Sequence, residues 1–157
     1  MPTVRPARAG EGDAVRQVVR AAFATYVARM GREPAPMGVD HARAIAAGKV
    51  WVAEEDGRLT GVLMIEPAAD HLYLDTLAVA PGEQRRGVGT ALLAVAEHEA
   101  RRAGLAEVRL FTNVLMSENL LFYPRHGYRE VARGEWNGYQ RVQFSRRLEI
   151  DQALPEK

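Results

Sequence analysis

One segment constrains the fold of this chain more than any other. Between residues 71 and 103, an alternating strand pattern, a glycine-containing turn and an apolar helix pattern follow one another directly. The turn reads APGEQRRG and contains Gly82 and Gly87. A strand that runs directly into a helix favours an α/β fold, because the helix packs back on the sheet. The helix start also presents unpaired backbone N–H groups, which favour binding of an anion such as a phosphate.

The rest of the chain supplies further strands and helices around this segment. We expect strands at residues 3–7, 50–54, 59–66, 71–79, 107–112, 128–136 and 139–147, and helices at 14–30, 39–47, 87–103 and 117–126. The tetrapeptide EDGR and the pair Asn137-Gly138 predict two tight hairpins. Three adjacent strands favour an antiparallel half, and the strand-helix-strand order around 71–112 adds a parallel pair. The predicted fold is mixed α/β (α+β mixed), with a central mixed, mostly antiparallel sheet of about seven strands flanked by about four helices.

Side-chain patterns indicate how the helices begin, end and pack. Asp13 is expected to cap the first helix. Gly104 is expected to end the long helix, after Arg101 and Arg102 at the negative end of its dipole. The residues predicted to face the core are Val15, Val18, Val19, Ala22, Phe23 and Val27 in the first helix, Val88, Leu92, Val95 and Ala96 in the long helix, and Leu120 and Leu121 in the last.

Length and composition exclude several classes of protein. A length of 157 residues predicts one domain, residues 1–157, with a loose tail at 149–157. The 21 basic and 20 acidic residues nearly balance, which gives no case for nucleic acid as the main partner. The chain has no cysteine, and His41, His71, His98 and His126 lack ligand spacing, so we expect no thiolate nucleophile and no metal. The absence of a membrane-length apolar run or a signal peptide predicts a cytoplasmic protein without a membrane partner.

The turn before the long helix does not fit the common nucleotide-binding motifs. A nucleoside-triphosphate loop needs a lysine and a serine or threonine directly after the second glycine, whereas Val88 and Gly89 follow Gly87 here. A dinucleotide fingerprint needs a third glycine, and Leu92 occupies that position. What remains is either a general anion site at a helix start, or a connection that needs glycine only for its geometry and carries solvated arginines.

The stretch LAVAPGEQRRGVGTALL resembles the core signature of the GNAT superfamily of acyl-CoA N-acyltransferases. In that family a strand ending Leu-x-Val runs into Gln/Arg-x-x-Gly-x-Gly/Ala at a helix start, and the order of elements over residues 3–147 is similar too. The resemblance implies that the anion is the pyrophosphate of coenzyme A (CoA). The residues that it places at the cofactor are Leu77, Ala78, Val79, Gln84, Arg85, Arg86, Gly87, Val88, Gly89 and Thr90.

A second stretch, SENLLFYPRHGY, resembles the family's helix that ends in Tyr-x-x-x-Gly-Phe/Tyr. The resemblance implies that Tyr123 lies near the CoA sulfur and protonates the departing thiolate. Asn119 precedes Tyr123 by four residues, so both lie on one helix face. The family often has an asparagine seven positions before the tyrosine, where this chain has Met116; Asn119 is preferred over Asn113 for that contact. The alternative for Tyr123 is an ordinary packing tyrosine.

Acyl transfer to an amine requires a deprotonated nitrogen, a stabilised oxyanion and a protonated leaving sulfur. Asp75 is the candidate base, since it shares a strand face with Tyr73, Leu77 and Val79; the alternative is a structural carboxylate. Glu54 and Glu55 are lesser candidates. The resemblance implies an oxyanion donor among the backbone N–H groups near Leu77–Val79. Without a cysteine or a Gly-x-Ser-x-Gly elbow, direct transfer in a ternary complex is expected.

The sequence therefore predicts an N-acetyltransferase with acetyl-CoA as co-substrate and a small-molecule amine as acceptor. A peptide or protein N-acetyltransferase (N-terminus or lysine) and a non-catalytic CoA sensor remain alternatives, and a homodimer is left open. The acceptor is expected between residues 30–38 and the last hairpin, where Trp136 and Tyr139 either wall a pocket or pack the hairpin. Acidic residues there favour a cationic amine and basic ones a carboxylate: Glu33, Asp40, Asp75 and Glu135 against Arg32 and Arg141.

Overall fold

A computed structural model describes residues 2–33, 37 and 39–149. The chain divides into two compact units. The first comprises Met1–Glu66 and Leu74–Val95, and the second comprises Pro67–Tyr73 and Ala96–Lys157. The prediction that residues 1–157 form one domain stays a prediction. The tail beyond Glu149 and residues 34–36 and 38 of the loop at 30–38 lie outside the described residues.

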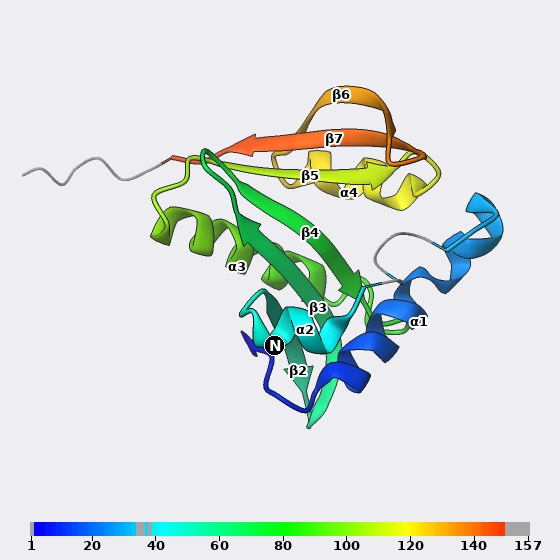
Figure 1. Cartoon of the computed structure of the whole chain (residues 1–157), viewed down its shortest axis with the longest axis vertical. Coiled ribbons are helices and arrows are strands. Elements are labelled where there is room, and N and C mark those ends of the chain that lie inside the picture. The colour runs from blue at the N-terminus through cyan, green and yellow to red at the C-terminus, as the bar shows by residue number, and fades with distance from the viewer. Residues whose placement is uncertain (1, 34–36, 38, 150–157) are drawn as a thin grey trace, which may run out of the picture. The chain divides into compact units, whose positions relative to one another are not determined.

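The first unit contains the N-terminal strands and the start of the long helix (Figure 1). Its elements are β1 (Thr3–Pro6), α1 (Gly12–Met30), α2 (His41–Ala46), β2 (Val50–Glu55), most of β3 (Arg58–Pro67) and β4 (Leu72–Val79), and the first part of α3 (Val88–Arg102). The strands follow the order β1-β2-β3-β4, and β2 is antiparallel to both β1 and β3. The predicted EDGR hairpin is present: Asp56 and Gly57 have φ of 53° and 78°, as a two-residue turn of this type requires.

The second unit contains the remainder of α3 and the C-terminal strands. Its elements are β5 (Glu107–Asn113), α4 (Ser117–Arg125), β6 (Arg129–Trp136) and β7 (Tyr139–Arg147). Strand β7 lies between β5 and β6 and is antiparallel to both (Figure 1). Asn137 and Gly138, with φ of 54° and 80°, turn the chain between β6 and β7 as predicted.

The expected fold class is confirmed. The described residues form a mixed α/β fold with seven strands, mostly antiparallel, and four helices. Every predicted element is present, and most of the observed bounds differ from the predicted ones by one or two residues. The predicted parallel pair, 71–79 with 107–112, would join the two units and stays a prediction.

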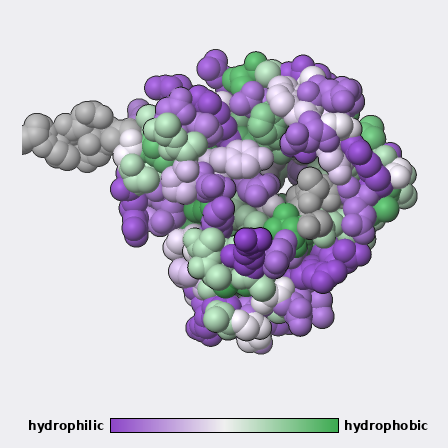
Figure 2. Space-filling model, viewed as in Figure 1, coloured by the Kyte–Doolittle hydropathy of each residue, from purple (hydrophilic) through white to green (hydrophobic). Residues whose placement is uncertain are grey.

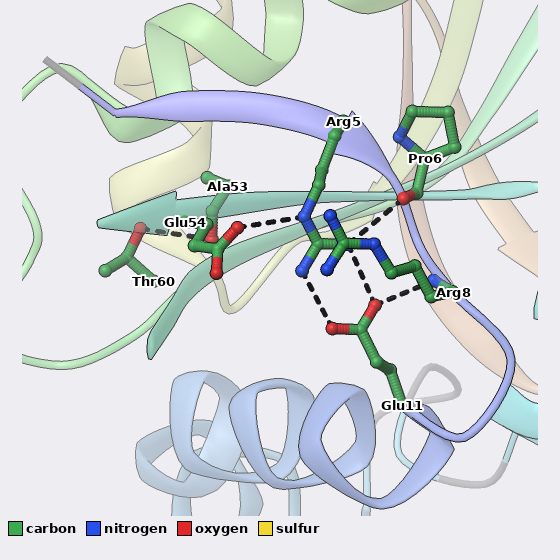
Figure 3. Close-up of polar contacts among 7 residues, drawn as sticks. All are labelled: Arg5, Pro6, Arg8, Glu11, Ala53, Glu54 and Thr60. Carbon is green, nitrogen blue, oxygen red and sulfur yellow. Dashed lines mark hydrogen bonds and ion pairs between the residues drawn. The ribbon is translucent and has the colours of Figure 1, made fainter. Parts of the chain in front are cut away.

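The start of α1 corrects one prediction. Glu11, not Asp13, precedes the first helical residue, and Asp13 lies within the first turn. The Glu11 carboxylate is held by Arg5, whose Nη2 lies 2.8 Å from Oε2, and it accepts a hydrogen bond from the backbone N–H of Arg8 at 2.7 Å (Figure 3). The same guanidinium donates from Nε to Glu54 on β2 at 2.9 Å. Two of these contacts are local, whereas the contact with Glu54, 49 residues away, connects the start of α1 to β2, which the local sequence does not show.

The core consists of apolar side chains on one face of each element. In α1, Val15, Val18, Val19 and Phe23 are buried, whereas Ala22 and Val27 are half-buried. In α3 the prediction holds for Val88, Leu92 and Ala96; Val95 is half-buried, while Leu93 and Ala100 are buried as well. Leu121 of α4 is 60% exposed, so its assignment to the core is wrong. On the face that Figure 2 shows, hydrophilic residues dominate and hydrophobic ones lie in small groups.

Candidate active site

The turn between β4 and α3 has the properties of an anion site. Gly82 and Gly87 have φ of 89° and 84°, positive values that glycine adopts without steric cost. Among the described residues, the N–H groups of Gln84 to Gly89 donate no backbone hydrogen bond. The first such bond of the helix runs from the N–H of Ala91 to the carbonyl of Gly87, at 3.0 Å. The segment therefore presents a run of available N–H donors at the positive end of α3.

Two further features hold this turn in shape. Arg85 has φ of 68°, a left-handed conformation that is uncommon for a residue with a side chain and often occurs at functional sites. Glu83 is only 7% exposed, and its Oε2 accepts a hydrogen bond from Arg58 of β3 at 2.9 Å. Its Oε1 lies 4.0 Å from Arg86. The buried carboxylate anchors the turn to β3 and leaves the exposed Arg85 and Arg86 side chains beside the N–H groups.

Strand β4 shows the alternation that the sequence predicts. Leu72, Leu74, Thr76 and Ala78 are buried, whereas Tyr73, Leu77 and Val79 are half-buried and Asp75 is exposed on the other face. Asp75 therefore lies where a base would have to lie to meet a substrate from solvent. Glu54, a lesser candidate, is engaged by Arg5 at 2.9 Å. That ion pair gives Glu54 a structural role.

Tyr123 is buried in the second unit, on α4. Its ring packs against Phe122, Tyr128 and Phe144, with centroids 5.2–5.7 Å apart. The side chain is 4% exposed, and burial raises the pKa of its hydroxyl well above the ordinary value of 10.0. The tyrosine therefore keeps its proton at neutral pH, so its hydroxyl can donate a hydrogen bond or a proton. Its packing environment also fits the alternative, a core tyrosine, so its catalytic role stays a proposal.

The two asparagines near α4 differ in their contacts. Asn113 closes a local turn, since its Oδ1 accepts from the N–H of Leu115 at 2.9 Å. Asn119 directs its amide nitrogen to the hydroxyl of Thr112 on β5, at 3.0 Å. Asn119 therefore bridges α4 and β5 one turn before Tyr123. The contact of Asn113 is local, whereas that of Asn119 joins two elements. The preference for Asn119 over Asn113 as the CoA contact stays a prediction.

Next to Tyr123 lies a buried polar cluster that the sequence does not predict. Glu97 of α3 is 9% exposed and accepts hydrogen bonds from the Tyr128 hydroxyl at 3.0 Å and from Arg146 of β7 at 2.9 Å. Arg146 also donates to the carbonyl of His126 at 3.2 Å and lies over Gly127, where a Cβ would approach its Nε to 3.2 Å. The cluster fixes the backbone that follows Tyr123. Glu97 and Arg146 are 49 residues apart, so no local pattern signals their pairing.

The first unit contains a pocket of about 330 Å³ beside Asp75. Its lining comes from α2 and the residues around it, from Lys49, from the end of β3 and from Asp75: Val39, Asp40, Arg43, Ala44, Ala47, Lys49, Met64, Ile65, Glu66 and Asp75. The structure thus brings together two of the predicted acidic residues, Asp40 and Asp75, which are 35 positions apart. No sequence motif contains Arg43 or Lys49, so the sequence alone does not indicate a role for either.

The aromatic residues of the last hairpin pack within the second unit. Trp136 lies against Phe111 of β5, with ring centroids 4.8 Å apart. The Arg141 guanidinium lies 5.1 Å from the Tyr139 ring centroid and 6.0 Å from that of Phe111. These contacts support the packing alternative for Trp136 and a cation–π role for Arg141.

Of the other acidic residues predicted near the acceptor, Glu33 forms an ion pair with Arg20 at 3.3 Å.

The helices and the potential metal ligands of the described residues bear on membranes and cofactors. Among the described residues, none of the helices combines the length and the apolar character needed to span a bilayer. The same part of the chain holds no group of three or more His, Cys, Asp or Glu side chains placed to bind a metal ion. His41 is buried and its ring nitrogens have no hydrogen-bond partner; burial lowers its pKa below 6.5, with the charge of Arg16 acting in the same direction.

Known proteins share this arrangement. The model of the acetyltransferase (GNAT) domain family matches residues 46–130. The chain is 32% identical over 106 residues to the probable N-acetyltransferase 14 of Xenopus tropicalis, covering 66% of this chain and 52% of that protein. It is 35% identical over 102 residues to the mycothiol acetyltransferase of Nocardia farcinica, covering 64% and 31%. It therefore spans about half of the first relative and about a third of the second.

A solved structure agrees in fold. The PaiA N-acetyltransferase of Thermoplasma acidophilum, in complex with coenzyme A, matches with a TM-score of 0.79 at 16% identity, covering 94% of this chain and 99% of that one. At this identity the match shows the fold alone. The family match over more than half of the chain, with the strand-turn-helix anion site inside it, shows that this chain belongs to the GNAT acetyltransferase family.

Proposed function

We propose that this protein transfers the acetyl group of acetyl-CoA to the primary amine of a small molecule, by direct transfer in a ternary complex. The observation that carries the proposal is the set of N–H donors at Gln84 to Gly89, which are left without backbone acceptors at the start of α3. A pyrophosphate offers several anionic oxygens to such a set of donors. The exposed Arg85 and Arg86 add positive charge beside it.

The reaction assigns separate tasks to three parts of the chain. The amine nitrogen attacks the thioester carbonyl, a C–N bond forms, the C–S bond breaks, and the products are an acetamide and the CoA thiol. In this proposal Asp75 takes the proton that the nitrogen loses, directly or through water. Backbone N–H groups near Leu77, Ala78 and Val79 stabilise the oxyanion, and Thr90 extends the phosphate contacts of the turn. No covalent enzyme intermediate is required.

Tyr123 acts on the leaving sulfur in this proposal. A thiol has an ordinary pKa of about 8.5, below that of tyrosine, so full proton transfer from Tyr123 to the thiolate is unfavourable unless the thiolate is desolvated as well. The raised pKa of Tyr123 therefore supports hydrogen-bond donation to the sulfur, with the proton passing late. The expected contribution is an acceleration rather than an absolute requirement.

A pocket of about 330 Å³ supports a small-molecule acceptor. Pockets that hold small ligands measure roughly 300–1,000 Å³, so this one is at the small end. A cytoplasmic location and a homodimer, both expected from the sequence, stay predictions.

The test combines turnover with a loop variant. Thiol release from acetyl-CoA is measured across a panel of amines, amino acids and peptides, and CoA binding is measured by calorimetry. We expect release with at least one small amine, and loss of CoA binding in Gly89→Glu, where a carboxylate stands among the N–H donors. Ala94→Glu, at an exposed position of α3, is the matched control and should bind CoA normally.

The outcomes separate the alternatives. Normal CoA binding by a folded Gly89→Glu variant would remove the turn from the CoA site. Higher kcat/KM for a peptide than for the free amine of the same group would favour the peptide acetyltransferase. Tight CoA binding without thiol release from any acceptor would favour the non-catalytic sensor.

A further inference from the structure

The pocket beside Asp75 is lined by charged residues from both the helical segment and the strands, which bears on the kind of acceptor that it can bind. On the helical side are Asp40 and Arg43, and on the strand side are Lys49, Glu66 and Asp75. Apolar residues complete the lining, among them Val39, Met64 and Ile65. All of these residues belong to the first unit.

Most of these charges are already engaged by neighbours. Lys49 and Glu66 form an ion pair, with Nζ and Oε1 3.2 Å apart. Asp40 precedes α2, and its Oδ1 accepts a hydrogen bond from the backbone N–H of Arg43 at 3.1 Å. That contact uses the Arg43 backbone and leaves its side chain out.

Arg43 is the exception. Within the described residues, its guanidinium makes no hydrogen bond and no ion pair, although the side chain lines the pocket. Guanidinium groups bind carboxylates through two parallel N–H···O bonds, a geometry that a simple amine does not use. Arg43 is exposed, so water solvates its guanidinium in the absence of a ligand; a carboxylate would pair with it, whereas an acceptor with an amine alone would be repelled by it.

We infer that the acceptor carries a carboxylate as well as its amine, as a free amino acid does. The carboxylate pairs with Arg43, the amine is directed to Asp75, and the rest of the molecule lies on the apolar surface between them. The inference rests on the proposed function, and it narrows the acceptor from small amines in general to zwitterionic ones. A volume of about 330 Å³ accommodates a molecule of this size.

The experiment compares substrates that differ only at the carboxylate. The twenty standard free amino acids, their carboxamides and their decarboxylated amines are assayed with acetyl-CoA. For the preferred side chain, we expect kcat/KM for the amino acid to exceed that for the amide and the amine at least about tenfold, the size of effect that one charge-assisted contact provides. Equal or better turnover of the amide or the amine would overturn the inference while leaving acetyl transfer intact.

Variants assign the effect to Arg43. Arg43→Gln should lower kcat/KM for the amino acid about 10- to 100-fold, mainly through KM, with little change for the decarboxylated amine. Arg43→Lys should restore part of the loss, because the charge returns without the planar fork. Arg129→Gln, an exposed arginine on β6, is the matched control and should behave as wild type. Equal losses for amino acid and amine in Arg43→Gln would show that the side chain has no role in carboxylate binding.

A binding measurement keeps the inference testable without turnover. Calorimetric titration of the CoA-bound protein with the same amino acids and amides reports on the pocket directly. Binding of an amino acid that is lost in Arg43→Gln would support the inference even if the protein acetylates nothing. If no member of the panel turns over and no amino acid binds, the inference is wrong.

Discussion

At the scale of single residues, Tyr123 has the clearest expected phenotype. Its buried hydroxyl keeps its proton, so replacing it removes a hydrogen-bond donor without removing a charge. Tyr123→Phe should lower kcat about 10- to 1,000-fold and leave CoA affinity nearly unchanged. Steady-state kinetics with a solvent isotope control for rate-limiting chemistry checks this. A wild-type kcat under those conditions would make Tyr123 a packing residue only.

Glu11 gives a prediction about pH at the same scale. Hydrogen bonds from Arg5 lower its pKa from 4.5 to about 2. The folded state therefore binds fewer protons than the unfolded state, so the stabilisation is complete above about pH 4.5 and is lost as the pH falls toward 2. Glu11→Gln should destabilise the protein by roughly 1–3 kcal/mol at pH 7 and flatten the dependence of stability on pH between 5 and 2. Urea unfolding across that range measures it, and an unchanged slope would contradict it.

At the scale of elements, the close approach of β3 and α3 determines where the anion-binding helix start lies. A Cβ on Gly61 would come within 2.8 Å of Leu92 and Val88 and 3.2 Å of the Ala78 carbonyl. Gly61→Ala should therefore push α3 away from the strand, costing about 1–3 kcal/mol and weakening CoA binding. Gly134→Ala on β6 is the matched control, since its Cβ would meet only Trp136 at 3.7 Å. Unfolding and CoA titrations compare the two, and equal behaviour would contradict the prediction.

The Glu97 cluster makes a second prediction about elements, because it joins α3 to β7 and to the residue after Gly127. Glu97→Gln leaves the volume nearly unchanged and keeps one side-chain oxygen as an acceptor for the Tyr128 hydroxyl, but it removes the negative charge that faces Arg146. We expect a loss of about 1.5–3 kcal/mol. Glu99→Gln on the same helix is the control, since Glu99 lies 3.9 Å from Arg102 at the surface and should cost under about 0.5 kcal/mol. A smaller loss in Glu97→Gln than in Glu99→Gln would show that the cluster does not stabilise the fold.

At the scale of the whole molecule, the question is whether the two units unfold together. Helix α3 passes from the first unit to the second between Val95 and Ala96, so neither unit can unfold fully without breaking that helix. Each unit contains one of the two tryptophans, Trp51 and Trp136. Trp136→Phe and Trp51→Phe therefore leave a fluorescent reporter for one unit each. For each variant, we expect the urea midpoint measured by tryptophan fluorescence to coincide with the midpoint measured by circular dichroism. Separate transitions would show two domains.

The sequence by itself determined the elements and the turn that we propose to bind an anion. Both depend on short-range physics: alternating side chains along 71–79, the positive φ that Asn137-Gly138 and Asp56-Gly57 accept, and the unpaired N–H groups of a helix start after glycine. Neighbours in the chain suffice to specify such features. The proposed acetyl transfer follows from the resemblance of the same turn to the family signature.

The tertiary structure alone decided which distant groups meet. Arg5 fixes the start of α1 by pairing with Glu11 and Glu54, and so Asp13 is not the cap. Glu97 accepts hydrogen bonds from Tyr128 and Arg146, and Arg43 lines the same pocket as Asp75. A charged side chain shows no periodicity that reveals its partner, because ion pairs depend on proximity in space and their members lie tens of residues apart in the chain. The acceptor specificity that we propose therefore depends on the fold, whereas the proposed type of reaction follows from the family resemblance of the sequence.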